Sequence, residues 1–490
     1  MKKIFLIVVW GVWILPSVAQ VPNPAVFGQT ITRHELSEAL QILAAADMEG
    51  REAGSPGQKK AAAYISDQFH KMGLKPVVSD SGGGKSYYQP LVLSRSKILT
   101  ARVRRNSQKL THLKEMICLN GNTYGNEVKV PLVFVQKGNP EDYTGLDVKG
   151  KAVLMVDYAE DAIEKKEYAL EQGAVAFFAV TTRTASQFNR QMKLFSFYLS
   201  RPKVELKESG KPFPTFMISP EYAAVLLNVA EGEFQTLSRG HSSEVQYKVE
   251  VEETFLSTEN VVGIVEGTDK KEEVIVITAH YDHIGKQGEK IYYGADDNAS
   301  GTVALLEIAE AFAEAAKQGV RPRRSVLFIA LTAEEKGLLG SDYYTQNPLF
   351  PLEKTVTNLN MDMVGHLDQN HTQNPRFVSV VGSDWLSSEL HEIHETANQK
   401  YVQLELDYRF NSPTHPEMFY YRSDQYNFAK FGIPVIFYTS ADHEDYHKPT
   451  DTVDKIKFER IEGVAQLIFY TAWEIANREK RLKVDKTPPH

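Results

Sequence analysis

Apolar runs of strand length alternate with amphipathic helical segments in the second half of the chain. The runs cover residues 274–277, 326–331, 377–381 and 435–438. Between the first two, apolar residues recur at i, i+3, i+4 and i+7 from Leu305 to Phe312, and Gly319 closes the predicted helix. Unbroken apolar runs are typical of strands that are covered on both faces. From Asn260 onward the pattern therefore predicts a doubly wound α/β layout, in which ligands bind at the carboxyl ends of the strands.

Two helices near the N-terminus are predicted by their capping residues. Thr32, with a glutamate three residues later, opens a helix that runs through Ala46. Ser55, followed by a proline and by a glutamine three residues later, opens a second helix that ends at Gly73. Residues 96–253 differ, because short β-rich runs are separated there by turn residues and basic clusters. This stretch predicts a separate β-rich module.

The first twenty residues are typical of a secretory signal peptide. Lys2 and Lys3 precede an apolar run that reaches Leu15, and a small-residue pattern ends at Ala19, so we expect cleavage before Gln20. A membrane anchor is the alternative. The run is too short to cross a bilayer of roughly 30 Å, and no cysteine follows the cleavage site to carry a lipid.

Composition and charge narrow the class of protein further. The 490 residues, 42% hydrophobic and 24% charged, indicate a globular protein with room for two domains. Removal of residues 1–19 takes away two lysines and no acids, which leaves 53 basic and 63 acidic residues and argues against a nucleic-acid partner. Cys118 is the one cysteine, so no intrachain disulfide can form. We expect an exported protein, periplasmic or extracellular, with the bacterial periplasm favoured.

Acidic residues and histidines follow the predicted strands at the points where the strands end. The acids are Asp296, Asp297, Glu334, Glu335 and Asp362, and His447 follows the last run. His280 and Asp282 come directly after the first run, and residues two apart on an extended segment point to the same side, so Asp282 could orient a metal-binding His280. Each acid alone is more often a helix-start charge that the helix dipole favours. Candidate ligands at five strand ends, at residues 280, 296–297, 334–335, 362 and 447, nevertheless indicate a metal site at the carboxyl edge of one sheet.

The order and spacing of these residues resemble the M28 family of zinc peptidases. The matching segments are HYD at 280–282, GADDNASG at 294–301, AEEKGLLGS at 333–341, NMD at 360–362 and YHKPTDT at 446–452. Residues 47–73 resemble the family's N-terminal segment, and residues near 125–225 resemble the protease-associated domain that many members carry as an insertion.

This resemblance implies a fold and a domain organisation. The fold is an α/β fold with a mixed, mostly parallel sheet flanked by helices, of the zinc-exopeptidase phosphorylase/hydrolase-like type. The expected domains are a signal peptide at 1–19, a discontinuous catalytic domain at 28–95 and 254–480, and an inserted β-rich protease-associated domain at 96–253.

Carried over position by position, the family pattern also implies the ligands of two zinc ions. Asp297, four residues before a glycine, would be the carboxylate that bridges both ions. His280 and Asp362 would complete one zinc, and Glu335 and His447 would complete the other.

The family pattern implies catalytic roles beside these ligands. Glu334 would be the general base, Asp282 would orient His280, and the peptide between Asp297 and Asn298 would be cis. The chemistry agrees, because two Zn²⁺ carry +4 and the three carboxylate ligands carry −3, so a bridging hydroxide makes the cluster neutral and is the expected nucleophile. Zinc lowers the pKa of bound water to about 7, which leaves Glu334 to take the water proton and pass it to the leaving amine.

A competing motif lies near the C-terminus. His443 to His447 spell HExxH, the zincin signature, which binds zinc when it lies on a helix. Here the motif closely follows a predicted strand, and Pro449 comes shortly after it. We therefore interpret the motif as a loop.

Two further segments that contain histidine or aspartate are not assigned to the metal site. His391 and His394 have the wrong spacing for HExxH and are expected on an exposed helix face. In residues 422–428, which resemble a family stretch, Gln425 stands where histidine is common, and the role of Asp424 stays open.

Several functions remain compatible with these motifs. A dinuclear zinc exopeptidase is favoured. The alternatives are a carboxypeptidase at the same site, a single-zinc glutaminyl cyclase, which would not need His280, and a binding protein that has lost its ligands, against which the intact ligand set argues.

We favour an aminopeptidase, because a dinuclear site can coordinate a neutral α-amine, and Lys336 and Lys448, the basic residues inside the matched motifs, are expected to face solvent. The expected partner is a peptide substrate, with no nucleic acid, no membrane span after signal cleavage, and a monomeric chain.

Matched substitutions distinguish the two candidate bases. We expect Glu334→Gln to keep its zinc and to lose about 10²- to 10⁴-fold in kcat, the usual contribution of a general base. Glu444→Gln should turn over at the wild-type rate, because its motif is predicted to be a loop. Steady-state kcat and zinc per chain of both variants check this, and the reverse ordering would make HExxH the active motif.

Overall fold

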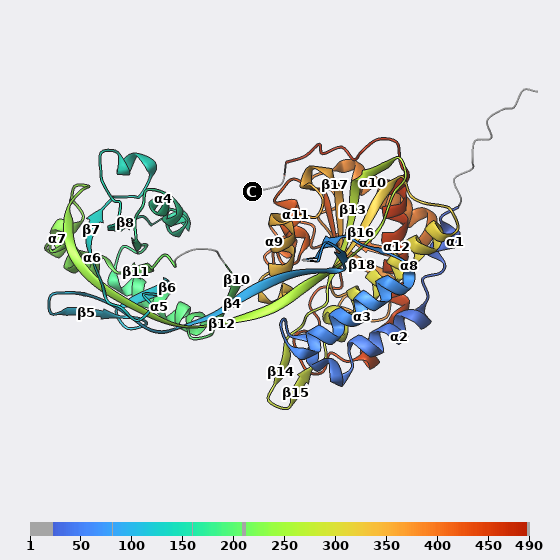
Figure 1. The fold of residues 1–490 in the computed structure, drawn as a ribbon, viewed down its shortest axis with the longest axis horizontal. Coiled ribbons are helices and arrows are strands. Elements are labelled where there is room, and N and C mark those ends of the chain that lie inside the picture. Colours follow the sequence, from blue (N-terminus) through green and yellow to red (C-terminus); the bar gives the residue numbers. More distant parts are fainter. Residues whose placement is uncertain (1–22, 81, 159, 208–211, 488–490) are drawn as a thin grey trace, which may run out of the picture. The chain divides into compact units, whose positions relative to one another are not determined.

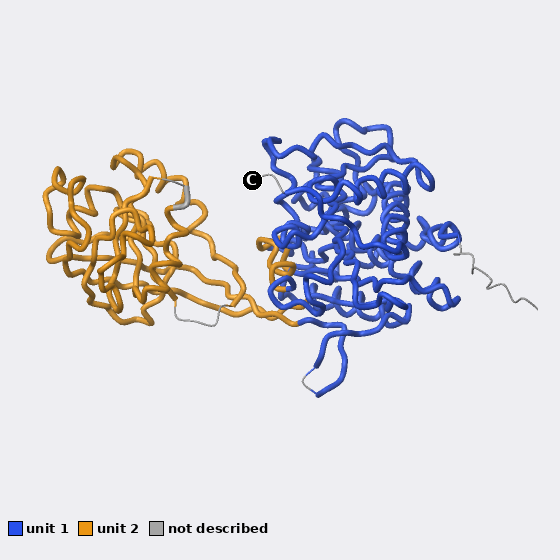
Figure 2. Tube along the Cα trace, turned by 90° about the horizontal axis from the view of Figure 1, so that it is seen from above, with its two compact units in different colours: residues 1–89, 260–332, 344–490 blue, residues 90–259, 333–343 orange. Residues whose placement is uncertain are grey.

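The computed structural model describes residues 23–487 apart from residues 81, 159 and 208–211. The chain forms two compact units (Figures 1 and 2). Among the described residues, unit 1 comprises residues 23–89, 260–332 and 344–487, and unit 2 comprises residues 90–259 and 333–343. The expected signal peptide at 1–19 lies outside the described residues. Within the described part of the chain, no helix is long and apolar enough to cross a membrane.

One mixed sheet forms the centre of unit 1. Its strands lie in the order β19 (Glu405–Asp407), β18 (Phe377–Val381), β20 (Val435–Thr439), β17 (Thr355–Met361), β13 (Lys270–His280), β16 (Arg324–Leu331) and the end of β12 (Ser242–Val265). Strands β16, β13, β17 and β20 are parallel, whereas β12 runs antiparallel to β16 and β18 runs antiparallel to β20. The edge strand β19 is parallel to β18. The mixed, mostly parallel sheet is thus confirmed, and the carboxyl ends of its parallel strands share one edge.

Alternate residues of the strands face two different cores. Ile275 and Ile277 pack in the core that includes Phe312, whereas Val274 and Val276 pack in the core that includes Phe428. Successive side chains of a strand point to opposite faces, so a strand between two layers is apolar throughout. The first core is built with α1 (Ala25–Gly28), α2 (Arg33–Leu43), α3 (Pro56–Met72), α8 (Gly301–Lys317), α10 (Ser388–Ala397) and α12 (Phe458–Asn477), and the second with α11 (Gln425–Ala429).

The capping residues of the N-terminal helices behave as predicted. The side chain of Thr32 accepts a hydrogen bond at the start of α2, the side chain of Ser55 does so at the start of α3, and Gly73 ends α3 in the left-handed conformation. Helix α2 stops at Leu43, before the predicted end at Ala46. The chain turns there into the 3-10 segment η1 (Ala46–Arg51), whose last three residues have positive φ.

Unit 2 contains its own group of strands and its own helices. The strands lie in the order β12, β7 (Val128–Phe134), β8 (Ala152–Val156), β9 (Ala176–Val180), β11 (Thr215–Ile218) and β6 (Met116–Asn120), while β4 (Tyr88–Arg105) pairs with β12, β5 (Gln108–Thr111) and β10 (Lys203–Leu206). The helices are α4 (Lys166–Glu171), α5 (Ala185–Leu199), α6 (Pro220–Leu227) and α7 (Glu231–Phe234). The sequence predicted a β-rich module and missed these helices, although Thr184 caps α5 by the same local pattern as in unit 1.

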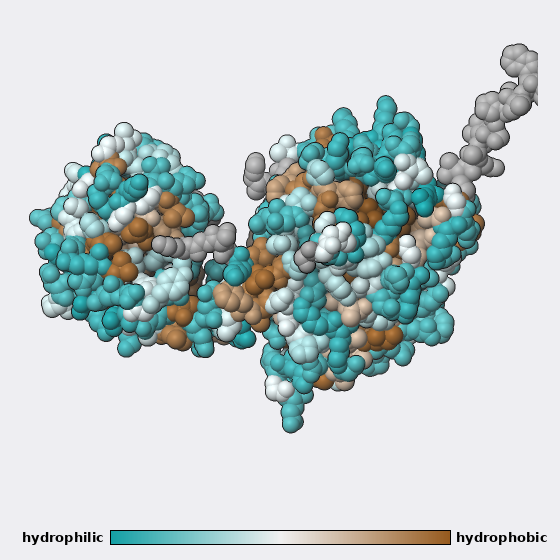
Figure 3. Space-filling model, in the orientation of Figure 1, coloured by the Kyte–Doolittle hydropathy of each residue, from teal (hydrophilic) through white to brown (hydrophobic). Residues whose placement is uncertain are grey.

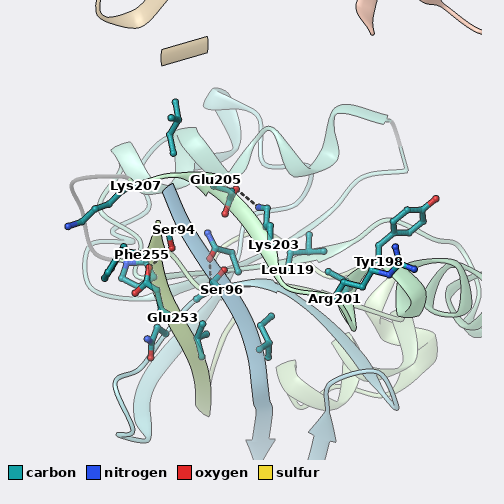
Figure 4. A pocket seen from close by; sticks show the side chains of 18 of the residues that line it. Ser94, Ser96, Leu119, Tyr198, Arg201, Lys203, Glu205, Lys207, Glu253 and Phe255 are labelled. Carbon is teal, nitrogen blue, oxygen red and sulfur yellow. Dashed lines mark hydrogen bonds and ion pairs between the residues drawn. The ribbon is translucent and has the colours of Figure 1, made fainter. Parts of the chain in front are cut away.

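A pocket of about 480 Å³ in unit 2 is lined by residues of β4, β10, β12 and α5 (Figure 4). In its wall Lys203 pairs with Glu205, and the ammonium of Lys207 lies 4.6 Å from the ring centroid of Phe255. The face of the molecule in Figure 3 is mainly hydrophilic, with scattered hydrophobic patches.

The aromatic cluster between α8 and α12 should dominate the stability of unit 1. Phe312 is fully buried and its ring centroid lies 4.9 Å from that of Phe469, so Phe312→Ala should lower the free energy of unfolding by about 3–5 kcal/mol. Phe431→Ala, at a residue that is 54% exposed, should cost less than about 0.5 kcal/mol. After removal of residues 1–19, Trp385 and Trp473 of unit 1 are the tryptophans that remain, so fluorescence-detected denaturation reports on this unit. Equal losses in the two variants would contradict this account.

Candidate metal centre

Four of the five predicted metal ligands lie at the carboxyl edge of the parallel strands of unit 1. His280 is the last residue of β13, Asp362 directly follows β17, and His447 lies in the loop after β20. Asp297 belongs to the irregular turn Ala295–Ser300, which precedes α8. Because β13, β17 and β20 are parallel neighbours, their carboxyl ends lie side by side.

The Asp297 carboxylate lies between two sets of possible ligand atoms. Its Oδ1 is 3.5 Å from Nε2 of His280, and Oδ1 of Asp362 is 3.1 Å from the same nitrogen. The other oxygen, Oδ2, is 3.1 Å from Nε2 of His447 and 3.6 Å from Nδ1 of His283. A carboxylate whose two oxygens face different imidazoles can bridge two metal ions.

The donor set of this centre fits zinc. Ligand atoms of His280, Asp297 and Asp362 all lie within 4.8 Å of one another, and the three side chains are buried. Two carboxylates held together away from water repel each other unless a cation lies between them. Imidazole nitrogens and carboxylate oxygens are ligands that zinc prefers.

His280 is oriented through its second ring nitrogen. Nδ1 lies 3.2 Å from the main-chain oxygen of Asp282 and 3.9 Å from the side-chain Oδ1 of the same residue. With its hydrogen on Nδ1, the ring donates to the carbonyl, and Nε2 keeps its lone pair facing the carboxylates. Asp282 therefore contacts the ring through its main chain more closely than through its side chain.

Asn298 ties the turn that carries Asp297 to the loop that carries Asp362. The Nδ2 of Asn298 donates to the Met361 carbonyl at 2.9 Å, and its Oδ1 accepts from the Met363 amide at 3.1 Å. These contacts flank Asp362 on both sides. The peptide between Asp297 and Asn298 is cis, as the sequence predicted.

Asp451 and Gly294 shape the start of the same turn. The Asp451 carboxylate accepts hydrogen bonds from the amides of Asp296 at 2.9 Å and Asp297 at 3.1 Å. Burial, with the charge of Asp296, raises the pKa of Asp451. Gly294 has φ +57, and a Cβ at this position would lie 2.6 Å from the His283 ring, so the turn requires glycine.

Asp296 forms a buried ion pair behind the turn. Its Oδ2 lies 3.2 Å from Nε2 of His443 and accepts from the Ser440 hydroxyl, while Oδ1 accepts from the amides of Gly365 and His366. Burial opposes ionisation of Asp296, but the hydrogen bond and charge of His443 outweigh it and lower the pKa of this carboxyl. The same contact raises the pKa of His443 against the cost of its burial. The pair holds the loops after β17 and β20 against the turn.

Glu334 and Glu335 follow the parallel strand β16 within four residues. They begin the 3-10 turn η5 (Glu334–Lys336), after Ala333 with φ +56 and before α9 (Leu339–Gln346). Both side chains are partly exposed. Residues 333–343 group with unit 2, so the assignment of these glutamates as base and ligand stays a prediction from the sequence pattern.

Two residues of the centre were missed in the sequence. His283 is fully buried, and its ring centroid lies 5.9 Å from that of His447. A histidine directly after the HYD segment was the available signal for it. The Ser423 hydroxyl donates to Oδ2 of Asp362 at 2.7 Å, and no local pattern joins these residues because they lie 61 positions apart.

The HExxH segment forms turns, as predicted, and not a helix. Gln425, whose meaning the sequence left open, has a structural role. Its Oε1 accepts from Nδ2 of Asn360, and its Nε2 donates to the Tyr420 carbonyl, so it supports β17 just before Asp362. Asp424 is fully buried directly before α11.

The prediction of an exposed helix face was wrong for His394. This residue of α10 is fully buried, with Nδ1 3.2 Å from the Tyr438 hydroxyl. Burial lowers the pKa of His394 to about 3. The cause is the packing of α10 against α12, which the spacing of His391 and His394 does not reveal.

Another group of possible ligands, Asp368, His371 and Asp407, lies near strand β19 of the sheet. Arg409 pairs with both of its aspartates, and Nδ1 of His371 lies 2.8 Å from Oδ1 of Asp368. Because the guanidinium already supplies the positive charge, this group is an ion-pair network.

Known proteins resemble this chain in the region of the centre and beyond it. Residues 260–472 match the model of peptidase family M28. Aminopeptidase YwaD of Bacillus subtilis (strain 168) is 27% identical over 364 residues, which cover 73% of this chain and 69% of that protein. A probable glutamate carboxypeptidase, LAMP1 of Arabidopsis thaliana, is 30% identical over 171 residues, which cover 34% of this chain and 24% of that protein.

A solved structure has a similar fold. The aminopeptidase from Aneurinibacillus sp. strain AM-1 superimposes with a TM-score of 0.50 and 21% identity, over 95% of this chain and 98% of that chain.

The amount of bound zinc should depend on the Asp297 carboxylate. Asp297→Ala should lose all bound zinc, because this carboxylate faces both sets of ligand atoms, and His447→Ala should lose about half. His371→Ala is the matched control and should keep the wild-type content, because its group is an ion-pair network. Elemental analysis of the dialysed proteins checks this. Zinc retained by Asp297→Ala, or lost from His371→Ala, would contradict it.

Proposed function

Because this chain is a member of peptidase family M28 through residues 260–472, and hence a metallopeptidase, we propose that it is an exported aminopeptidase with two zinc ions. It would remove N-terminal residues from peptides by hydrolysis. The observation that carries the proposal is the position of Asp297, whose two carboxylate oxygens face His280 on one side and His447 on the other.

The proposed ligands divide around this carboxylate. His280 and Asp362 hold one zinc together with Asp297, and His447 and Glu335 hold the other. Three of these side chains, His280, Asp297 and Asp362, are supported by their mutual distances, and His447 by its contact with the outer oxygen of Asp297. Glu335 is proposed from its place just after β16, a parallel neighbour of β13.

The remaining residues move protons and orient ligands. When bound, two zinc ions supply a water of lowered pKa and polarise the scissile carbonyl. Glu334 accepts the proton of the attacking water and delivers it to the leaving amine. Asp282 orients His280, in line with the contact between its main-chain oxygen and Nδ1 of the ring.

Cleavage at the amino end is favoured over cleavage at the carboxyl end. The relative that matches 73% of this chain is an aminopeptidase, whereas the probable carboxypeptidase matches 34% of it. Lys448 is exposed and donates to the Glu444 carbonyl, in line with the expectation that it faces solvent. The buried acidic groups of the centre suit an amine better than a carboxylate.

Three other features complete the proposal. Export rests on the signal-like residues 1–19 and places the enzyme in the periplasm or outside the cell. Unit 2 is proposed to be the protease-associated domain; the compact unit starts six residues before and ends six residues after the expected range 96–253. The enzyme is proposed to act as a monomer.

Blocked peptides test which end is attacked. N-acetylation of a good peptide substrate should abolish hydrolysis, because it removes the free amine that the centre would coordinate. Amidation of the carboxyl end should change the rate by less than about two-fold, since that end is not held. Chromatography of the products against the unblocked peptide measures both. Trimming of the acetylated peptide from its carboxyl end would make the enzyme a carboxypeptidase, even with the zinc assignment intact.

A further inference from the structure

Arg51 is a buried arginine whose guanidinium joins three separate segments of unit 1. Its side chain is 1% exposed. Nε donates to the Tyr281 carbonyl at 2.8 Å, and Nη2 donates to the Gly294 carbonyl at 2.8 Å. Nη1 donates to the carbonyls of Leu43 at 2.7 Å and Tyr293 at 2.8 Å. All four acceptors are main-chain oxygens, so the side chain fixes backbone directly.

Two of these acceptors lie beside proposed ligands. Tyr281 stands between His280, which ends β13, and Asp282, which orients it. Gly294 opens the turn that carries Asp297. One guanidinium therefore holds the backbone on both sides of the space between His280 and Asp297.

The backbone around Arg51 has an uncommon conformation and is closely packed. Arg51 has φ +54, a left-handed conformation that is uncommon for a residue with a side chain. Gly50 precedes it, and a Cβ there would lie 2.3 Å from the Tyr292 oxygen and 2.5 Å from the Gly285 oxygen, in the hairpin of β14 (Gly285–Gln287) and β15 (Lys290–Tyr292). The carbonyl of Arg51 accepts from the His283 amide at 3.2 Å. Backbone held in such a conformation is often found at functional sites.

We propose that Arg51 is a positioning residue of the metal centre, which sets the separation between His280 and Asp297 by fixing the loops at Tyr281 and Gly294. The inference rests on the proposed zinc centre. Arginine suits the task because its rigid, planar fork presents five donors in fixed directions, whereas lysine offers three donors from a single point. Gln58, at the start of α3, adds a hydrogen bond to the Tyr281 hydroxyl.

Arg324 provides a matched control. It is likewise 1% exposed and donates to the main-chain oxygens of Ile475 and Arg478, but it begins β16, at the strand end opposite to the metal centre. A lysine at either position should destabilise the fold. Only the substitution of Arg51 should weaken zinc binding.

The test compares Arg51→Lys, Arg324→Lys and the wild-type mature chain. Zinc affinity is measured by competition with a chelator, and the geometry of the site by the visible spectrum of the cobalt-substituted protein. Arg51→Lys should bind zinc about 10- to 100-fold more weakly, with a changed cobalt spectrum, the effect expected when a support behind a ligand is lost. Arg324→Lys should stay within about two-fold of the wild type in affinity, with an unchanged spectrum.

The outcomes separate this inference from the proposed function. A wild-type chain that binds no zinc would refute the zinc centre itself. If the wild type binds zinc, then unchanged affinity and spectrum in Arg51→Lys, or an equal loss in Arg324→Lys, would overturn the positioning role. If Arg51→Lys does not fold, Arg51→Gln decides, because its shorter side chain cannot reach all four carbonyls and keeps two amide donors. A loss of about ten-fold or more in zinc affinity, with a changed cobalt spectrum, supports the role, and no loss overturns it.

Discussion

Three consecutive buried polar residues, Asp296, Asp297 and Asn298, impose the constraint on which the rest of the centre depends. A polar group taken out of water costs free energy unless it meets partners, and a buried charge costs more. The Asp296 carboxylate pairs with His443 and accepts hydrogen bonds from main-chain amides. The Asn298 side chain forms hydrogen bonds with the main chain on either side of Asp362. These partners come from loops after different strands. The turn can therefore be buried only when the sheet that carries those loops is complete.

The mixed sheet satisfies this constraint by aligning strand ends. Parallel pairing of β13 with β17, and of β17 with β20, brings loops that are far apart in the sequence to one edge. The apolar strands form the rigid part, and each loop contributes a polar residue. The N-terminal segment stabilises this edge of the sheet, because Arg51 and Gln58 both form hydrogen bonds with Tyr281 in the loop after β13. Stability of the fold and geometry of the centre are thus coupled through the same hydrogen bonds.

The same residue types elsewhere in unit 1 do not make such a centre. Asp368, His371 and Asp407 lie as close together as metal ligands do, yet Arg409 neutralises the two carboxylates. The HExxH segment has the letters of a zinc motif, but its turns do not present two histidines on one helix face. Charge compensation and backbone geometry, more than composition, separate the proposed centre from these groups.

The sequence by itself determined the features that arise from neighbouring residues. Apolar runs of strand length located β13, β16, β18 and β20, and capping residues located the starts of α2 and α3. Resemblance of short motifs, and not any periodicity, indicated the ligands. Tertiary structure alone decided the burial of His394, the contact of Ser423 with Asp362 and the clamp made by Arg51. The physical reason is distance along the chain: the hydrogen bonds of Ser423 and Arg51 join residues 61 and 230 positions apart, and such contacts leave no trace in a local pattern.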